Sequence, residues 1–365
     1  MPALHRLLLS LALLSPAAHA AHAADDGWPA ARVGDTAFDP ARLRALDARL
    51  GDGSLKQLTG VFVVQRGQPV YERYFNGADA DTLHDVRSAT KSVTALLVGA
   101  AIDRGKLPGV QDRVYDRFPE FLARHPVDPR LRTTTLADLL TMSSQWECDD
   151  ENPFSTGNEE RMYVTERWLD FALALPVKGY APWMRKPADS PHGRSFAYCT
   201  AASFVAGAVV ERAVGQPLPE FAADALERPL GIARSQWNRS PEGIGMGGGG
   251  TRYRSRDLAK FGQLVLDQGR WHGKQVISAA YIAAMTSEQA KANDEAEYGY
   301  QWWRMHFDVA GRDVAAWAMS GNGGNYVLVV PERQLVAVIT STAYNQRNGH
   351  TASREIFREL LTALR

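Results

Sequence analysis

The chain has 365 residues, of which 45% are hydrophobic and 22% charged, so it can bury a large core in one compound domain or two intimate lobes. Lysine plus arginine and aspartate plus glutamate number 41 each, which leaves no formal net charge. This balance provides no overall field to attract nucleic acid or an anionic membrane surface. The expected partner is therefore a small molecule.

Residues 1–23 predict a cleaved secretory signal. A basic start precedes the apolar run Leu7–Leu14, and two small-x-small sites end at Ala20 and Ala23. The apolar run is too short to span a bilayer as a stable anchor. There is no cysteine near the cleavage point, so lipid attachment is not expected. We therefore expect a soluble, exported protein, periplasmic or secreted, without a stable membrane anchor.

A helix and a hairpin follow the signal. Asp39 and Pro40 open a helix whose apolar residues end at Leu50. The runs Val61–Val64 and Val70–Phe75, joined by a glycine-containing turn, predict a β-hairpin. The sheet thus begins before the next helix.

That next helix carries a candidate nucleophile. Apolar residues from Val93 to Ile102 recur at helical spacing, which places Ser88 in the first turn and Lys91 one turn further on the same face. The first N–H groups of a helix are unpaired and carry partial positive charge, which favours a developing oxyanion. This is the geometry of a Ser-Lys nucleophile. The spacing alone is also compatible with an N-cap serine and a surface lysine.

The middle of the chain, about residues 119–290, has a mostly helical pattern. It predicts a helical lobe inserted into a sheet lobe made of about residues 24–118 and 291–365. Within the helical lobe, the acidic run Glu147–Glu151 lacks the alternation of a calcium loop and is interpreted as a solvated loop. The run Gly247–Gly250 indicates close backbone approach or a flexible rim, since no phosphate-loop motif follows it.

Strands return near the C-terminus. Val314–Met319, Tyr326–Val330 and Leu335–Thr340 alternate or run apolar and predict an antiparallel meander, and Ser353–Leu364 predicts a closing helix. The fold class expected from these elements is α+β, with an antiparallel β-sheet flanked by helices and an inserted, mainly helical lobe.

Two further stretches complete a set of three motifs. Phe196–Thr200, which contains Tyr198, precedes a helix, and Ser320–Asn325 lies at a strand entrance. With the Ser88 motif, and in this order, they resemble the serine β-lactamase and penicillin-binding-protein superfamily. The resemblance is to the branch with class C β-lactamases, D-aminopeptidases, DD-carboxypeptidases, esterases and nylon-oligomer hydrolases. It covers nearly all of residues 24–365 and implies a site between sheet and helical lobe.

The resemblance implies a role for each motif residue. Ser88 attacks an acyl carbon and forms an acyl-enzyme, while Lys91 and Tyr198 share the proton traffic. Either a neutral Lys91 or a Tyr198 phenolate beside a charged Lys91 is the base. The oxyanion hole is expected from the backbone N–H groups of Ser88 and Asn325. Further contacts to the substrate are expected from Thr200, Asn322, Gly323 and Gly324.

Two departures from the usual motifs bear on the substrate. Thr200 stands where the second motif usually has asparagine, and Asn322 stands where the third usually has lysine or histidine. A cation there helps to hold a substrate carboxylate, so we expect a neutral ester or amide in place of an acid. The segment Arg252–Arg256 would restore acid recognition if one of its arginines reached the cleft.

Three alternatives stay open beside this esterase or amidase. They are a β-lactamase, a carboxypeptidase acting on a short D-alanyl peptide, and a non-catalytic ligand-recognition protein of the same fold. A Ser-His-acid hydrolase is not supported, because no Gly-x-Ser-x-Gly elbow occurs. The sequence lacks the His-Glu-x-x-His motif that would indicate a zinc site. We therefore expect neither a metal nor a cofactor.

The chain has two cysteines, Cys148 and Cys199, and both lie in the part expected to be exported. An oxidising compartment permits their pairing, which would close a loop of about 50 residues and contribute roughly 4 kcal/mol on the chain-entropy model. We predict a disulfide. The alternative is two buried free thiols.

Overall fold

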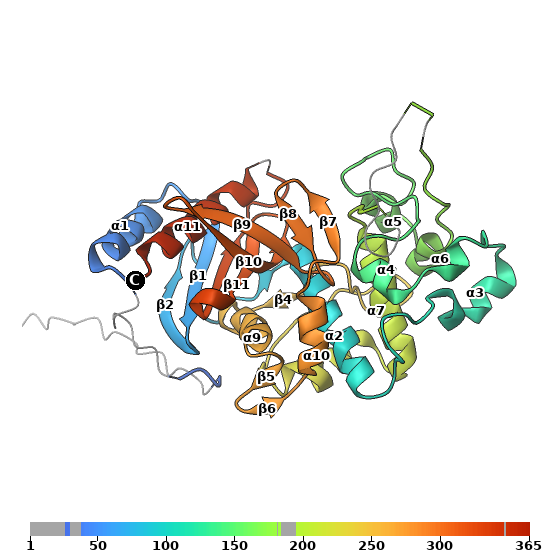
Figure 1. The fold of residues 1–365 in the computed structure, drawn as a ribbon, viewed down its shortest axis with the longest axis horizontal. Coiled ribbons are helices and arrows are strands. Elements are labelled where there is room, and N and C mark those ends of the chain that lie inside the picture. The colour runs from blue at the N-terminus through green and yellow to red at the C-terminus, as the bar shows by residue number, and fades with distance from the viewer. Residues whose placement is uncertain (1–25, 30–37, 181, 184–194, 347) are drawn as a thin grey trace, which may run out of the picture.

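An antiparallel sheet and a group of helices make up the computed structural model (Figure 1). It describes residues 26–29, 38–180, 182–183, 195–346 and 348–365. The predicted secretory signal, residues 1–23, lies outside the described residues. Of the helices in these ranges, none has the length and apolar character needed to cross a membrane.

The main sheet has eight strands within the described ranges, in the order β2-β1-β12-β11-β10-β9-β8-β7, and all its neighbours pair antiparallel. The predicted α+β class with an antiparallel sheet is thus confirmed. The strands are β1 (Leu58–Gln65), β2 (Gln68–Tyr74), β7 (Ala290–Asn293), β8 (Ala296–Tyr298), β9 (Trp303–Val309), β10 (Arg312–Gly321), β11 (Asn325–Val330) and β12 (Leu335–Ser341).

The predicted hairpin is β1–β2 and the predicted meander is β10–β11–β12, but β9, β8 and the edge strand β7 were not predicted. In β9 the side chains of Met305, Phe307 and Val309 are buried, whereas His306 and Asp308 are exposed. This strict alternation is the ordinary signal of a half-buried strand. The sequence therefore contained the evidence for β9.

The two faces of the sheet are covered by different helices. The helices are α1 (Pro40–Gly51), α2 (Thr90–Asp103), α3 (Pro119–Arg124), α4 (Leu136–Leu140), α5 (Glu159–Tyr163), α6 (Trp168–Leu173), α7 (Thr200–Val214), α8 (Leu218–Ala222), α9 (Ser255–Leu266), α10 (Ala279–Met285) and α11 (Gly349–Ala363). Helices α1 and α11 pack on one face, where Phe357 meets inward residues of the central strands. Helix α9 packs on the other face.

The position of α9 differs from the predicted division of the chain. It lies within residues 119–290, the range predicted as the helical lobe, yet it packs against β1, β11 and β12. The lobe boundary drawn at residue 290 therefore does not follow the packing. The helices grouped at the right of Figure 1 are α3, α4, α5, α6 and α7.

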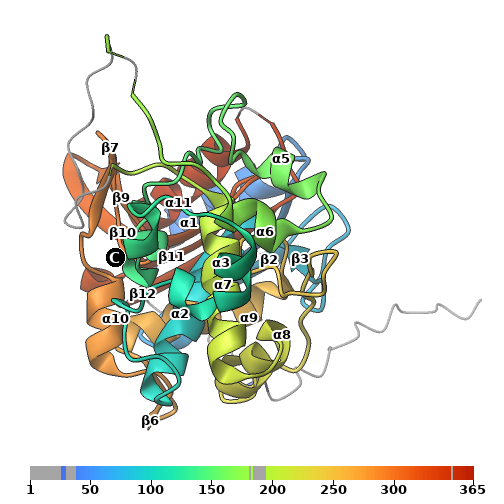
Figure 2. The same cartoon turned by 90° about the vertical axis from the view of Figure 1, so that its right-hand side faces the viewer.

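Helix α2 lies between the sheet and the group of helices α3, α4, α5, α6 and α7. Its residues from Thr90 to Ala101 are all buried, because one side contacts α7 and another contacts β10. Figure 2 shows α2 and α7 side by side in front of the sheet. A helix enclosed in this way holds whatever its first turn carries in a fixed position.

Candidate active site

The predicted nucleophile lies in a 3-10 turn, Arg87–Ala89, that leads directly into α2. Ser88 is half-buried there. The turn is fixed from both sides: the backbone N–H of Arg87 donates to Asp85 Oδ1 (3.0 Å), and Thr90 Oγ1 donates to the Arg87 carbonyl (2.7 Å). Arg87 has a φ of +49°, a conformation that a non-glycine residue adopts at a cost of about 1–3 kcal/mol.

Lys91 is buried beneath this turn, with 1% of its surface exposed. Its Nζ lies 3.0 Å from Ser88 Oγ, 3.0 Å from Thr200 Oγ1 and 2.6 Å from the carbonyl oxygen of Gly248. The structure therefore brings Ser88, Lys91 and Thr200 together. The serine and the lysine lie within the distance that proton transfer requires.

The run Gly247–Gly250 allows this arrangement. A side-chain carbon at Gly248 would lie 2.9 Å from the backbone oxygen of Thr200, so only glycine lets this segment approach α7 closely enough. The adjacent Gly247 carbonyl accepts a hydrogen bond from Thr94 of α2 (2.7 Å). Of the two readings of the glycine run, close backbone approach is the one that the structure supports.

Tyr198 lies on the other side of the lysine and is half-buried. The centre of its ring is 4.9 Å from Lys91 Nζ, and the ring stacks on Trp303 with centroids 5.8 Å apart. Thr200, which stands at the asparagine position of the second motif, is fully buried, and its hydroxyl oxygen accepts a hydrogen bond from Lys91 Nζ.

The third motif differs from its predicted register. Asn325 is 1% exposed, and its side-chain amide bonds to the backbone of Ser341 and Asn322, away from Ser88. Gly323 and Gly324 pack beneath the segment around Tyr344 and Gly349. These residues do not line the cavity at Ser88, so the assignments of Asn325, Gly323 and Gly324 are not supported by their positions.

The residues that reach the site come three positions earlier. Ser320, Gly321 and Asn322, at the end of β10, line a cavity together with Ser88. A side chain at Gly321 would collide with the carbonyl oxygen of Val86, so glycine is needed where β10 passes the Ser88 turn. The motif is therefore Met319-Ser320-Gly321, and the residue after its glycine is Asn322.

Asn322 is held by its neighbour. Its side chain donates to Asn345 Oδ1 (2.7 Å) and accepts from the Asn345 backbone N–H (2.8 Å). Met319, at the position where the family usually has a cation, is buried in the core. The expected lack of a strand-borne cation therefore applies in the corrected register as well.

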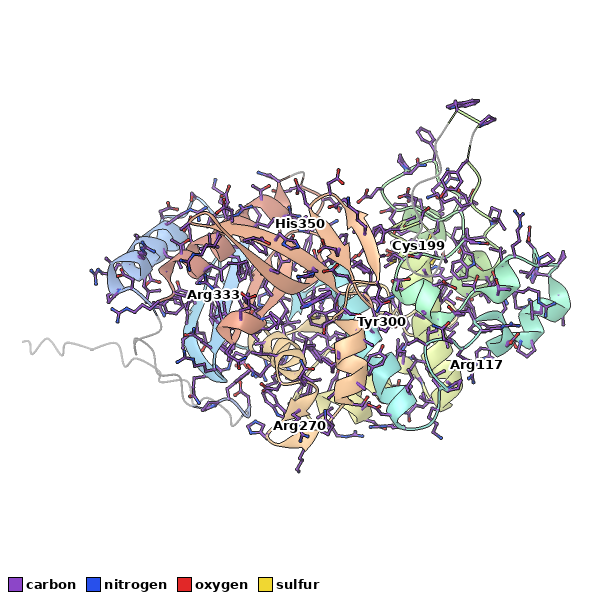
Figure 3. All side chains as sticks on the ribbon, viewed as in Figure 1. Arg117, Cys199, Arg270, Tyr300, Arg333 and His350 are labelled. Atoms are coloured by element: carbon purple, nitrogen blue, oxygen red, sulfur yellow. A yellow bond between two sulfur atoms is a disulfide. The ribbon has the colours of Figure 1, made fainter. Side chains whose placement is uncertain are left out.

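Two cavities meet at Ser88. One, of about 570 Å³, is lined by Tyr198, Trp303, Ser320 and the carboxylates Asp150, Glu151 and Glu159. The other, of about 400 Å³, is lined by Gly248–Gly250, Tyr163 and Trp168. In Figure 3, His350, which lines the first cavity, lies over the sheet, and Cys199 lies on the helical side. A substrate can thus extend to both sides of the nucleophile.

The charges around the first cavity favour a neutral or cationic substrate. Burial and the charge of Arg354 lower the pKa of His350 to about 4, so this ring is neutral at pH 7. The arginines proposed as replacements are already paired: Arg254 with Asp257 (2.6 Å) and Arg256 with Asp26 (2.6 Å). Arg252 bonds to Gln236, pairs with Asp85 (3.7 Å) and is not among the residues that line this cavity.

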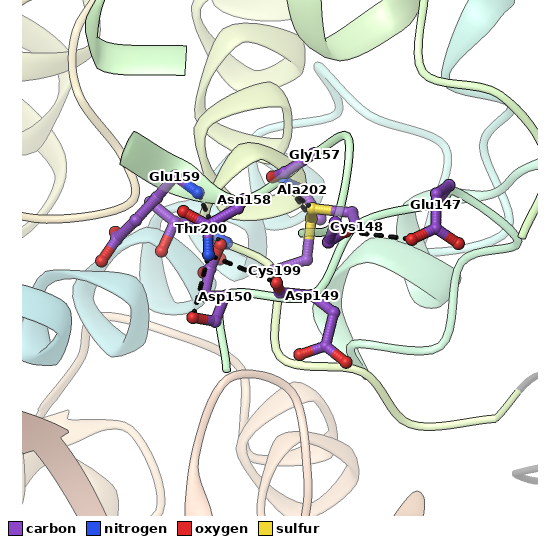
Figure 4. Close-up of a disulfide and its surroundings, with 12 residues drawn as sticks. Glu147, Cys148, Asp149, Asp150, Gly157, Asn158, Glu159, Cys199, Thr200 and Ala202 are labelled. Atoms are coloured by element: carbon purple, nitrogen blue, oxygen red, sulfur yellow. Dashed lines mark hydrogen bonds between the residues drawn. A yellow bond between two sulfur atoms is a disulfide. The ribbon is translucent and has the colours of Figure 1, made fainter. Parts of the chain in front are cut away.

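A disulfide joins Cys148 to Cys199, with Cα atoms 5.5 Å apart (Figure 4). It fastens the acidic run Glu147–Glu151 beside Tyr198 and Thr200. The prediction that this run is a solvated loop is wrong for Asp150, which is half-buried and accepts a 2.6 Å hydrogen bond from the Thr200 N–H. Among the described side chains, no group of His, Cys, Asp and Glu is arranged to hold a metal ion.

A family model described as Beta-lactamase matches residues 54–360. The chain is 28% identical over 307 residues to a 6-aminohexanoate-dimer hydrolase of Paenarthrobacter ureafaciens, which covers 76% of each protein.

Solved structures share the fold. A Bacillus anthracis protein provisionally assigned as a 6-aminohexanoate-dimer hydrolase aligns with a TM-score of 0.68 and 18% identity, over 86% of this chain and 80% of that one. A family VIII carboxylesterase aligns with a TM-score of 0.63 and 18% identity, over 90% and 98%.

Proposed function

The chain belongs to the β-lactamase family, and from this premise we propose that it is an exported serine hydrolase that forms an acyl-enzyme on Ser88 with a small neutral ester or amide. The family is of the serine-hydrolase type, and its named relatives include hydrolases. The single observation that carries the proposal is the 3.0 Å contact between Lys91 Nζ and Ser88 Oγ at the junction of two cavities.

Acylation begins with the proton of Ser88. A neutral Lys91 keeps two N–H bonds for the oxygens of Gly248 and Thr200 and offers its lone pair to the Ser88 hydroxyl. As Ser88 Oγ attacks the acyl carbon, its proton passes to Lys91 Nζ, and the carbonyl π electrons move to the oxygen. This contact supports Lys91 as the base, with the Tyr198 ring facing the ammonium that forms.

The oxyanion is stabilised by two backbone N–H groups. Ser88 lies in the first turn of a helix, where N–H groups have no intrahelical acceptor. Asn322 follows Gly321, the last residue of β10, which packs against the Ser88 turn, and it lines the same cavity. Such a pair typically contributes 10²–10³-fold per donor. Lys91 then returns the proton to the leaving alcohol or amine, and water repeats the sequence to release the acid.

The substrate class follows from charge. Asp150, Glu151 and Glu159 line the larger cavity, and a substrate carboxylate placed there would lose hydration and meet like charge. A neutral ester or amide avoids this cost. The localisation rests on the secretory pattern of residues 1–23 and on the disulfide, which persists in oxidising compartments.

Labelling with a fluorophosphonate probe tests the proposal. The wild type should gain one adduct, on the peptide that contains Ser88, and Ser88→Ala should gain none. A panel of short-chain esters, amides, D-amino-acid peptides and a chromogenic β-lactam then ranks the substrates. An adduct that persists in Ser88→Ala, or an unlabelled wild type, would contradict the proposal; the latter would favour a ligand-recognition protein.

One observation favours a second candidate, hydrolysis of a substrate with a distant carboxylate. A further cavity of about 310 Å³ adjoins the first through Trp303 and Ser320, and its charged lining includes Arg354 and Arg358 of α11 as well as Glu151 and Glu295. Arg354 donates to Tyr326 Oη (3.3 Å) and leaves other N–H groups for an anion. Comparing kcat/KM for esters with and without a terminal carboxylate, in wild type and Arg354→Ala, separates the two candidates.

A further inference from the structure

We propose that Asp150 is a positioning residue for the Ser88–Lys91 pair, acting through Thr200 in place of the asparagine that the second motif usually has. The inference rests on the proposed function. It names a residue outside the three motifs, located 50 positions before Thr200 in the chain.

Asp150 holds both ends of the second motif. Its backbone N–H donates to the Tyr198 carbonyl (2.8 Å), and its Oδ2 accepts from the Thr200 N–H (2.6 Å). Its Oδ1 accepts from the N–H of Glu159 at the start of α5 (2.9 Å). Tyr198 and Thr200 are thereby fixed to each other by one side chain and its backbone, as Figure 4 shows for the Thr200 side.

A covalent bond reinforces the same contact. Cys148 lies two residues before Asp150, and Cys199 lies between Tyr198 and Thr200. The disulfide therefore crosses the gap that the Asp150 hydrogen bonds also cross. Two independent links over a few residues keep the Asp150 carboxylate against the first turn of α7.

The contact continues to the nucleophile. Thr200 places its Oγ1 3.0 Å from Lys91 Nζ, which in turn lies 3.0 Å from Ser88 Oγ. A threonine hydroxyl reaches less far than an asparagine amide, so the backbone of Thr200 must be held closer to the lysine. Asp150 provides that restraint, because a charge-assisted hydrogen bond is short and strong.

Asp150 also carries a charge that changes near neutral pH. Burial raises its pKa to about 6; Lys91 opposes the rise whenever it is protonated, and the charge of Glu159 adds to it. The other titratable groups around the cavity are Tyr198, Glu151 and His350. An ionised Asp150 accepts more strongly from Thr200 and stabilises positive charge on Lys91 during acylation, whereas the protonated acid does neither.

The variant that tests this is Asp150→Asn, which keeps the shape and one acceptor but cannot ionise. With a short-chain p-nitrophenyl ester, we expect kcat to fall 10–100-fold, KM to change less than 3-fold, and the acid limb of the kcat/KM profile near pH 6 to disappear. Glu159→Gln is the matched control, because it removes a neighbouring carboxylate that does not contact Thr200. It should retain the limb, shifted to slightly lower pH.

A second measurement needs no substitution. The rate of fluorophosphonate labelling of wild type should rise with pH through the same apparent pKa. A flat labelling rate between pH 5 and 8, or an Asp150→Asn variant with an unchanged acid limb, would overturn the inference, the latter leaving Asp150 with a purely structural role. Because labelled Ser88 in wild type is the test of the proposed function, failure of the two ideas can be told apart.

Discussion

Lys91 and Lys260 are both buried lysines on helices, yet they are held by different partners. The Nζ of Lys260 lies 2.8 Å from a carboxylate oxygen of Asp257, and both side chains are fully buried. The hydrogen bonds of Lys91 Nζ go to neutral oxygens, one of them the Ser88 hydroxyl. A buried charge is costly without a counterion, and the Asp257 carboxylate supplies one to Lys260.

The structural lysine Lys260 and the proposed reactive lysine Lys91 differ in their nearest acceptors. Lys260 also donates to the Gly231 carbonyl (2.9 Å) and so ties α9 to the preceding loop. In the proposed mechanism, the neutral partners of Lys91 leave it free to exchange a proton with Ser88. Burial alone therefore does not indicate catalysis, and the identity of the nearest acceptors does.

Replacing Lys91 should have the largest effect on rate. In Lys91→Met, we expect kcat/KM for a short-chain ester to fall by at least about 10³-fold, since nucleophile and base act as a unit. The melting temperature should stay near that of the wild type, because methionine fills a similar volume without a buried charge. Steady-state kinetics and thermal unfolding on the same sample measure both. A Lys91→Met variant that is strongly destabilised, but whose folded molecules keep the wild-type kcat/KM, would contradict the comparison.

Replacing Lys260 should produce the converse result. In Lys260→Met, Asp257 keeps Arg254 at 2.6 Å but loses Lys260, the fully buried cation at 2.8 Å. We expect the free energy of unfolding to fall by roughly 3 kcal/mol, as for other broken buried pairs. The rate of fluorophosphonate labelling of the folded protein should change less than 3-fold. Denaturant unfolding measures the change in stability, and intact-mass analysis measures the labelling rate. A loss of labelling without a loss of stability would assign Lys260 a role at the site.

A change at Gly321 leaves both lysines in place and moves the nucleophile. A methyl group there would displace β10 from the Val86 carbonyl and so disturb the Ser88 turn. We expect Gly321→Ala to lower kcat/KM by 10–100-fold, the size of effect that a misplaced reacting group produces. Gly51→Ala, at a position with open space around it, is the control and should retain wild-type kinetics. Equal kinetics for the two variants would refute the corrected register of the third motif.

The sequence predicted those parts of the site that are local in the chain. Ser88 and Lys91 are three residues apart on one helix, so helical periodicity alone relates them. The contact of Asp150 with Thr200 spans 50 residues and depends on how two loops pack, which no local pattern expresses.

The register of the third motif has a similar explanation. Gly321 ends β10 and Gly324 precedes β11, so either glycine could belong to the third motif. The close approach of β10 to Val86 identifies Gly321 as the motif glycine. This steric fact exists only in the folded chain. The missed strand β9 is different, because its alternation is present in the sequence.

His84 extends the comparison to a buried base with neither a carboxylate nor a full set of hydrogen bonds. It is 5% exposed, and its Nδ1 lies 3.2 Å from Thr59 Oγ1. Burial lowers its pKa from 6.5 to about 4, with the charge of Asp79 opposing the shift. Between these values the unfolded chain binds more protons than the native protein, so the stability that neutral His84 permits is lost as pH falls.

The predicted loss attributable to His84 is about 2 kcal/mol between pH 7.5 and pH 5, from the linkage of those two pKa values. His350, whose pKa is also lowered to about 4, acts in the same direction, whereas Asp150, with its raised pKa, opposes both. Urea unfolding of wild type and His84→Gln at several pH values isolates the first contribution, because the other two groups remain in the variant. The slope of stability against pH should be shallower in His84→Gln. An identical slope would mean that His84 binds its proton equally in both states, and that a buried base needs no carboxylate to stay charged in this core.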